Sequence, residues 1–264
     1  MTRLVMSTGA AAALLGGCAG SWGPTHQEER VLTADAGTVE RLRLETANGS
    51  VRVTPWDRPI VRVDARVKSD LLDRLAETGV ALELDGPDVL VEALWPGGER
   101  RGRDGCDLTV RLPAAVEIVI VTSNDEVVVT ANGAFVDVTT SNDEIVITEP
   151  GGVIARTSND NVVIRRASGP VDVRTSNDDV VVTLTADNPG PVRIDTSNDD
   201  VELVVGPAFG GTLVARTSNG RVEVRGPGPG RSRGGTTAEL SFDRPGEASV
   251  VDTSNGDVEI EIEG

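Results

Sequence analysis

Alternating apolar and polar residues mark short strands along most of this chain. Aliphatic residues occupy the second and fourth positions before a recurring tetrad, and the third and fifth positions after its asparagine. This alternation has the period of a β-strand with one buried face. Among these flanking positions only Ser249 is polar. The pattern therefore predicts two short strands per repeat, joined by a sharp corner.

The tetrad reads Thr-Ser-Asn followed by Asp or Gly, and a Thr-Ala-Asn-Gly variant occupies residues 46–49. It recurs every 17 to 21 residues from Thr122 to Thr217, and Thr253 follows after 36. A fixed period near 20 indicates stacked repeats. We expect the corner threonine and asparagine to point inward, with the asparagine amides hydrogen-bonded between repeats as a ladder. The ladder consists of Asn124, Asn142, Asn159, Asn177, Asn198, Asn219 and Asn255.

These features predict an all-β protein whose residues 114–264 form a parallel β-helix, or β-solenoid, of about eight coils. Crossover chirality favours a right-handed solenoid. The long interval before Thr253 predicts one degenerate coil at residues 236–243. The final strand, residues 258–263, alternates with glutamates, which would protect an exposed sheet edge. The alternative is an antiparallel sandwich or meander, because similar turns also form hairpins.

Residues 60–112 interrupt the repeat, and residues 36–113 are expected to form an N-terminal β region and cap, since a solenoid needs its end covered. Strands are predicted at residues 61–67, 80–84, 88–94 and 107–112. A short helix is predicted over residues 69–78, with Ser69 as its N-cap and Gly79 ending it. Residues 97–105 form a polar loop.

The first 17 residues have the pattern of a secretory signal, with a short apolar stretch too brief to span a bilayer. Leu15-Gly16-Gly17-Cys18 resembles a bacterial lipobox, which implies a mature chain lipidated at Cys18 and held to a membrane. The alternative is an ordinary signal peptide that ends near a cysteine. Residues 18–35 are expected to include a flexible tether. We therefore expect an exported, lipid-anchored protein of the cell envelope, with Cys106 left as a quiet, unpaired thiol.

Composition excludes several functions. The 264 residues carry 42 acidic and 25 basic side chains, for a net charge of −17, which argues against a nucleic-acid partner. The single histidine, His26, and the absence of a visible nucleophile–base pair argue against an enzyme. An acidic corner edge could bind Ca²⁺, although a row of solvated turn residues is the favoured reading. Its members are Asp125, Asp143, Asp160, Asp178 and Asp199.

Two further rows lie on the predicted outer surface. One consists of arginines, namely Arg156, Arg174, Arg193 and Arg216. These are expected to neutralise nearby aspartates, with carboxylated glycans as the alternative partner. The other consists of valines, namely Val128, Val146, Val163 and Val181. An exposed aliphatic row indicates a covered or binding surface, and packing by the cap is favoured over a partner.

The chain resembles the bacterial putative-adhesin family of β-strand-repeat proteins, which are domains of unknown function. The resemblance rests on residues 47–53, on Trp56 followed by Val61-Arg62-Val63, on the helix-bearing insert, on residues 110–113 and on the repeated tetrad. It implies a β-solenoid with a surface-related role and transfers no catalytic motif. We therefore expect a non-enzymatic adhesin or envelope scaffold. A carbohydrate-active β-helix enzyme and a cation-binding envelope protein are the alternatives.

Overall fold

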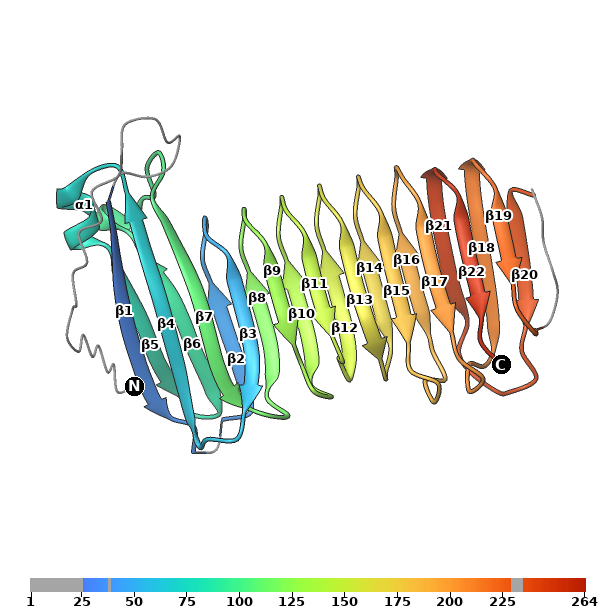
Figure 1. Ribbon diagram of the computed structural model, residues 1–264, viewed down its shortest axis with the longest axis horizontal. Coiled ribbons are helices and arrows are strands. Elements are labelled where there is room, and N and C mark those ends of the chain that lie inside the picture. The colour runs from blue at the N-terminus through green and yellow to red at the C-terminus, as the bar shows by residue number, and fades with distance from the viewer. Residues whose placement is uncertain (1–25, 38, 229–234) are drawn as a thin grey trace. The chain divides into compact units, whose positions relative to one another are not determined.

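The computed structural model describes residues 26–37, 39–228 and 235–264, and nearly all of its elements are β-strands (Figure 1). The chain divides into two compact units, one ending at Val128 and the other beginning at Val129. The expected signal peptide (residues 1–17), the lipidation site Cys18 and tether residues 19–25 lie outside the described residues. Within the described ranges, no helix is long and apolar enough to span a bilayer.

The first unit consists of strands, one short helix and a 3₁₀ turn at Pro96–Gly98. The elements are β1 (His26–Asp35), β2 (Arg41–Glu45), β3 (Val51–Trp56), β4 (Ile60–Ser69), α1 (Leu72–Glu77), β5 (Gly79–Asp85), β6 (Asp88–Leu94), β7 (Gly105–Pro113) and β8 (Glu117–Val121). One sheet has the order β1-β4-β7-β3 and the other has the order β8-β2-β6-β5. The pairs β1/β4, β4/β7 and β5/β6 are antiparallel, whereas β3/β7, β2/β6 and β2/β8 are parallel.

Two expectations for this unit need correction. Residues 26–35 form β1, paired along their whole length with β4, where a tether was expected. Polar residues on the inner side of β1 concealed this strand: Arg30 donates hydrogen bonds to the carbonyl oxygens of Leu75 and Thr78 at the end of α1. Ser69 is not the N-cap of α1: the N-cap is Leu71, two residues later, and it makes no side-chain capping bond.

The second unit contains only strands among its described elements. Strand β9 (Val127–Thr130) crosses the boundary between the units. The remaining strands are β10 (Phe135–Thr139), β11 (Ile145–Thr148), β12 (Gly152–Arg156), β13 (Val162–Ala167), β14 (Val171–Arg174), β15 (Val180–Leu184), β16 (Val192–Asp195), β17 (Val201–Val205), β18 (Thr212–Asn219), β19 (Val222–Arg225), β20 (Thr237–Ser241), β21 (Ser249–Asn255) and β22 (Val258–Ile262). Each tetrad joins a strand of one sheet to a strand of the other, and we call such a strand pair a coil.

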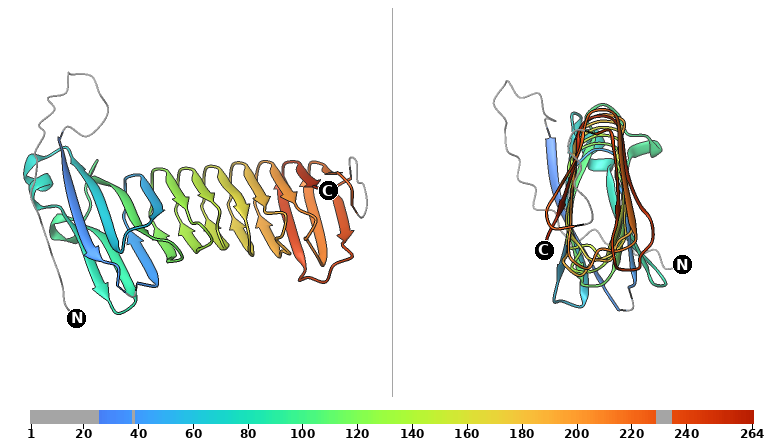
Figure 2. Two further views of the ribbon diagram at one scale, coloured as in Figure 1. Left: turned by 60° about the horizontal axis from the view of Figure 1, so that its bottom comes forward. Right: turned by 90° about the vertical axis from the view of Figure 1, so that its right-hand side faces the viewer.

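Neighbouring coils of this unit pair in parallel and in register. On one sheet Val153, Val171 and Val192 are successive partners, and on the other Val162, Val180 and Val201 are. Their side chains are buried between the sheets, as the alternation predicted. The end-on view in Figure 2 shows the strands and corners of successive coils superposed. The prediction of an all-β protein with stacked parallel strands is confirmed, while the handedness and the number of coils stay predictions.

The last coils do not stack in chain order. The two sheets have the orders β10 to β16 by alternate strands, then β21-β18-β20, and β11 to β17, then β22-β19. Figure 1 shows β21 and β22 placed before β18 and β19. The final strand is therefore internal, and the expectation that it forms an exposed edge is wrong. Residues 236–243 likewise form no stacked coil: β20 pairs antiparallel with β18 at the edge of its sheet.

Candidate interaction surface

The tetrads build a corner whose shape depends on each of its residues. The threonines of the Thr-Ser-Asn tetrads are buried. The hydroxyls of Thr140, Thr157, Thr175 and Thr196 donate to the carbonyl oxygen of the asparagine two residues later, at 2.8 Å from Thr157 and 2.9 Å from Thr175. This bond closes the turn from within. The aspartate that follows has a φ between 75° and 84° in every Thr-Ser-Asn-Asp tetrad, a left-handed conformation that Asp and Asn tolerate better than most residues.

The corner asparagines form ladders of side-chain hydrogen bonds within each unit. In the first unit Asn124 Nδ2 donates to Asn48 Oδ1 at 2.6 Å. In the second unit the spatial order is Asn142, Asn159, Asn177, Asn198, Asn255 and Asn219, and from Asn159 onward each Nδ2 donates to the Oδ1 of the asparagine before it at 2.9 to 3.0 Å. The threonines point inward as expected. The asparagines lie at the rim, half-buried or exposed, because their amides bond to the asparagines of neighbouring coils and do not point into the core.

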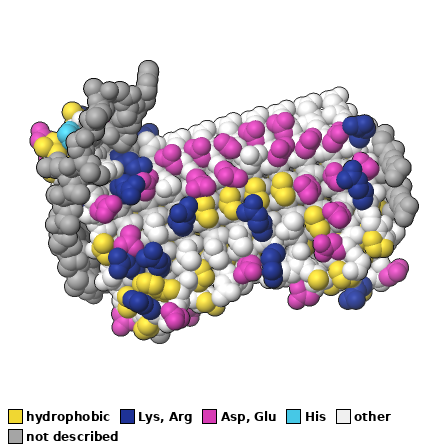
Figure 3. Space-filling view, in the orientation of Figure 1, with side chains coloured by type: hydrophobic (Ala, Val, Ile, Leu, Met, Phe, Trp, Pro, Cys, Tyr) yellow, Lys and Arg dark blue, Asp and Glu magenta, His cyan; other side chains and the backbone are white. Residues whose placement is uncertain are grey.

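The acidic edge forms two rows of half-buried or exposed side chains beside this ladder. The first row is the five aspartates named above, and the second consists of Glu126, Glu144, Asp179, Asp200 and Asp257. Figure 3 shows rows of acidic side chains on the face in view. Asp178 and Asp199 each accept a hydrogen bond from the backbone N–H of the aspartate in the preceding coil, at 3.0 and 3.1 Å. In the second row the bonds run in the opposite direction along the stack: Asp200 accepts from the backbone N–H of Asp257, and Asp257 accepts from that of Arg221. These carboxylates therefore have a structural role, with one oxygen on the backbone.

Metal binding at this edge finds no geometric support. The weak candidates Asp125, Asp143, Asp160, Asp178 and Asp199 each come from a different tetrad. In the described part of the chain, no three His, Cys, Asp or Glu side chains are grouped so that they could hold an ion. Backbone hydrogen bonds satisfy several of the carboxylates instead. For Asp257, the N–H of Arg221 and then its guanidinium lower the carboxyl pKa.

The valine row lies next to the acidic rows. Val146, Val163 and Val181 are successive partners on one sheet and are half-buried, as is Val128 in the first unit. The same line continues through Glu202, Glu259 and Glu223. The row thus changes from aliphatic to acidic along the stack. Figure 3 shows a short row of hydrophobic side chains beside the acidic ones.

The outward arginines pair with aspartates. Arg156 lies 3.3 Å from Asp137, and Arg174 lies 3.4 Å from Asp172. Arg216 lies 3.9 Å from Asp252, while Arg193 is exposed. Exposed pairs of this kind contribute little to stability, but they neutralise charge locally. Three of the four arginines of this row therefore pair with the protein's own carboxylates.

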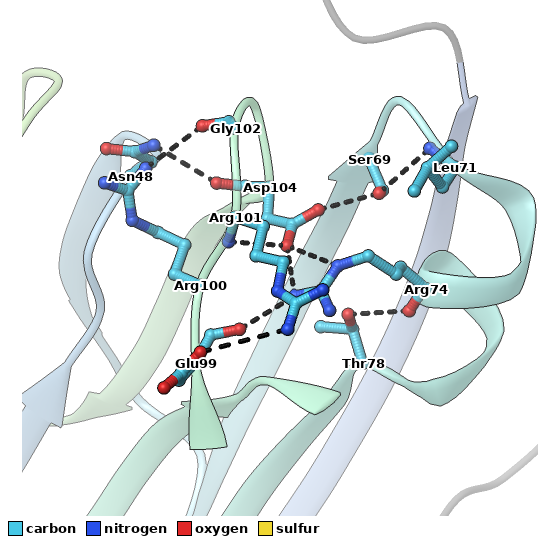
Figure 4. Close-up of polar contacts among 10 residues, drawn as sticks. All are labelled: Asn48, Ser69, Leu71, Arg74, Thr78, Glu99, Arg100, Arg101, Gly102 and Asp104. Atoms are coloured by element: carbon cyan, nitrogen blue, oxygen red, sulfur yellow. Dashed lines mark hydrogen bonds and ion pairs between the residues drawn. The ribbon is translucent and has the colours of Figure 1, made fainter. Parts of the chain in front are cut away.

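Sequence reasoning missed one cluster, which joins α1 to the polar loop of the first unit (Figure 4). Asp104 is 2% exposed and accepts hydrogen bonds from Arg74, from the Ser69 hydroxyl at 2.7 Å and from the backbone N–H of Arg101. Burial alone would raise the pKa of Asp104, but the bonds from Arg74 and Ser69 lower it below its ordinary value. Arg74 also donates to the carbonyl oxygen of Glu99. The cluster fixes the loop to the helix.

The cysteine of the first unit is also buried. Cys106 is fully covered, and burial, followed by the nearby charge of Asp107, raises the pKa of its thiol to about 12. A thiol of this kind is a poor nucleophile at neutral pH, because the thiolate is the reactive form.

No family model and no curated protein matches this chain. Several solved structures resemble it at low identity. One is a putative cell adhesion protein from Clostridium sporogenes, with 12% identity over 90% of this chain and 99% of that chain, and a TM-score of 0.39. A putative adhesin from Bacteroides fragilis has 8% identity over 88% of this chain and 96% of that chain, with a TM-score of 0.38. One from Parabacteroides distasonis has 11% identity over 89% and 96%, with a TM-score of 0.32. Similarity at this level assigns no function to the chain.

Proposed function

We propose that this protein is an exported lipoprotein of the cell envelope whose repeats form a β-solenoid that acts as an adhesin or surface scaffold, without catalysing a reaction. The lipobox-like run before Cys18 supports the lipid anchor, which would hold the chain to a membrane. The resemblance of the repeat to the putative-adhesin family supports the surface role.

One observation carries the adhesive part of the proposal: the acidic rows are both exposed and fixed in place. Backbone hydrogen bonds hold Asp178 and Asp199 on successive coils, about 4.8 Å apart as expected for neighbouring strands. Side chains that are already ordered lose little entropy when a ligand binds. A regular row of such groups also binds a repetitive partner by many weak contacts at once. The row is therefore suited to a cationic, repetitive surface.

A charge-matched comparison of cells tests this proposal. Replacing Asp160, Asp178 and Asp199 by asparagine removes three charges, while Asn keeps an acceptor oxygen and tolerates the left-handed backbone. The control replaces three exposed glutamates elsewhere, Glu77, Glu247 and Glu263, by glutamine. We expect cells displaying the asparagine variant to attach less to amine-coated glass than cells displaying the wild type or the control. Equal attachment of all three would contradict a role for the acidic rows.

The anchor is tested separately. In the wild type we expect the protein in the membrane fraction and labelled by radioactive palmitate, whereas Cys18→Ser should be unlabelled and leave that fraction. Membrane association that persists in Cys18→Ser would contradict lipid anchoring through this residue.

A further inference from the structure

The out-of-order stacking makes the last five strands a group of their own. Strands β20, β18 and β21 pair with one another on one sheet, and β19 pairs with β22 on the other. We call β18 to β22 the C-terminal module. A single covalent connection, residues 206–211, joins it to β17. The module otherwise meets the rest of the second unit only where β21 faces β16 and β22 faces β17, among the described strands. We call this contact the seam.

Charges are distributed unevenly across the seam. On it, Asp195 lies opposite Asp252 and Glu202 lies opposite Glu259, so carboxylates face carboxylates. Like charges directly opposite one another destabilise a pair of strands. The seam has three registered residue pairs between β16 and β21 and five between β17 and β22, whereas β18 and β21 share six and β19 and β22 share four. We call β21 and β22 the inserted coil, because they lie between the coils of β16/β17 and β18/β19. The facing carboxylates make the seam weaker than the contact of the inserted coil with β18 and β19.

Inside the module arginines neutralise the carboxylates. Glu223 lies opposite Glu259, but Arg225 bonds to both, and Arg221 lies 3.2 Å from Asp257. Arg216 lies 3.9 Å from Asp252. The inserted coil is thus attracted to the outer coil of its own module and repelled by the coil beneath it. If one contact opens, the module separates as a whole along the seam.

Despite this repulsion, hydrogen bonds across the seam fix how its two sides pair. The buried N–H of Val192 donates to the hydroxyl of Ser249 at 3.0 Å, and Asn255 Nδ2 donates to Asn198 Oδ1 at 3.0 Å. The N–H of Val201 donates to the carbonyl oxygen of Asp257 at 2.9 Å. An opened seam leaves these groups unpaired on both faces. The surface that matches them is the same seam of another copy of the chain.

We propose that the seam exchanges between two copies of this protein, so that the C-terminal module of each docks on β16 and β17 of the other. Reciprocal exchange reproduces every contact of the single molecule except those of the connecting segment. It gives a closed dimer, because neither copy is left with an unpaired seam. Residues 206–211 include Gly206, Gly210 and Gly211, which allow the connection to change direction. Self-association of this kind goes beyond the proposed function and does not depend on it.

Cysteine trapping in the full-length chain tests the exchange. One protein carries Asp195→Cys and a second carries Asp252→Cys, each with Cys18→Ser to remove the other accessible thiol. Both positions are on the outer face, and neighbouring strands are about 4.8 Å apart, within the range of a disulfide. We expect the mixed proteins, incubated together and oxidised, to give a disulfide-linked heterodimer. Raising the salt from low to high concentration should slow its formation by about fivefold, because salt screens Glu202 and Glu259, the facing carboxylates that remain at the seam in both variants.

Two controls make the result decisive. A single chain with both substitutions should form an internal disulfide, which shows that the geometry permits the bond. A mixture of Arg156→Cys and Arg174→Cys proteins should give no heterodimer, because these residues face one another across coils stacked in chain order. If the double variant closes its internal disulfide while the Asp195→Cys and Asp252→Cys mixture gives no more heterodimer than the arginine control, the exchange does not occur.

Discussion

Replacing Ser249 by alanine should destabilise the second unit far more than a serine-to-alanine change normally does. Ser249 is fully buried, and its hydroxyl accepts the hydrogen bond of the Val192 N–H. At the equivalent point of earlier coils, Val153 and Val171 donate to a proline carbonyl oxygen in the next coil. The inserted coil reaches Val192 by a different chain path and supplies a side-chain oxygen instead.

The expected loss follows from the buried group left behind. A buried donor without an acceptor costs about 1 to 3 kcal/mol, in addition to the lost hydrogen bond itself. We expect Ser249→Ala to lower the free energy of unfolding by at least about 1 to 3 kcal/mol in urea denaturation, with an unchanged m-value. The amide of Val192 should also exchange its hydrogen faster. Ser254→Ala is the matched control, because Ser254 is in the same coil but exposed.

The reasoning is refuted if Ser249→Ala and Ser254→Ala are equally stable within experimental error. That result would mean that the Val192 N–H does not depend on this hydroxyl, and with it the assigned order of the last coils would lose its main polar contact.

Three further predictions concern stability and reactivity. Gly256→Ala should cost at least about 3 kcal/mol, because Gly256 has a φ of 147° and a Cβ there would overlap the carbonyl oxygen of Asp199. Gly86→Ala, with a φ of 60° and open space around it, should cost only about 1 kcal/mol, and equal losses would refute the steric argument. Asp104→Asn should cost about 3 to 5 kcal/mol at neutral pH by breaking a buried ion pair. Because the folded pKa of Asp104 lies below 3.8, the wild-type advantage should be complete above that pH and disappear as the pH falls through the lowered pKa; an advantage that persists in strong acid would contradict this. Cys106 in a Cys18→Ser background should resist an aromatic disulfide reagent at pH 8 until urea is added, whereas rapid labelling of the native protein would contradict its burial.

Local pattern predicted the coils well because each coil follows the same physical rule. Alternation with period two identified the inward valines, and the fixed interval between tetrads indicated parallel stacking. The tetrad also predicted a ladder, since Asn is suited to corners. Its rim position was missed because alternation was extended through the turn, where the chain no longer alternates.

The order of the last coils could not be predicted from periodicity, since any coil of this pattern can stack on any other. Two signals in the sequence do mark the exception. The tetrads at 217–220 and 253–256 end in Gly where the regular coils have Asp, and Gly256 closely approaches Asp199. Ser249 is the one polar residue among the inward flanks. The glycine and the serine can be interpreted only when the neighbouring coil is known, because each is explained by a contact with that coil.

The cap resisted prediction for a different reason: its contacts join distant residues of mixed polarity. Arg74 and Asp104 are ordinary surface residue types, and only the folded chain brings them together in a buried pair. Strand β1 was missed because Arg30 occupies an inward position, where it caps the end of α1. Long-range polar contacts of this kind have no periodic signal.

Trypsin treatment of intact cells tests the central claim, that the protein acts at the cell surface. The exposed loop of the first unit carries Arg100, Arg101 and Arg103, which are accessible cleavage sites. The account predicts cleavage in this loop on intact cells, and its loss when the three arginines are replaced by glutamine. Protection on intact cells, with cleavage of the same loop after lysis, would contradict the adhesin and leave an internal envelope scaffold.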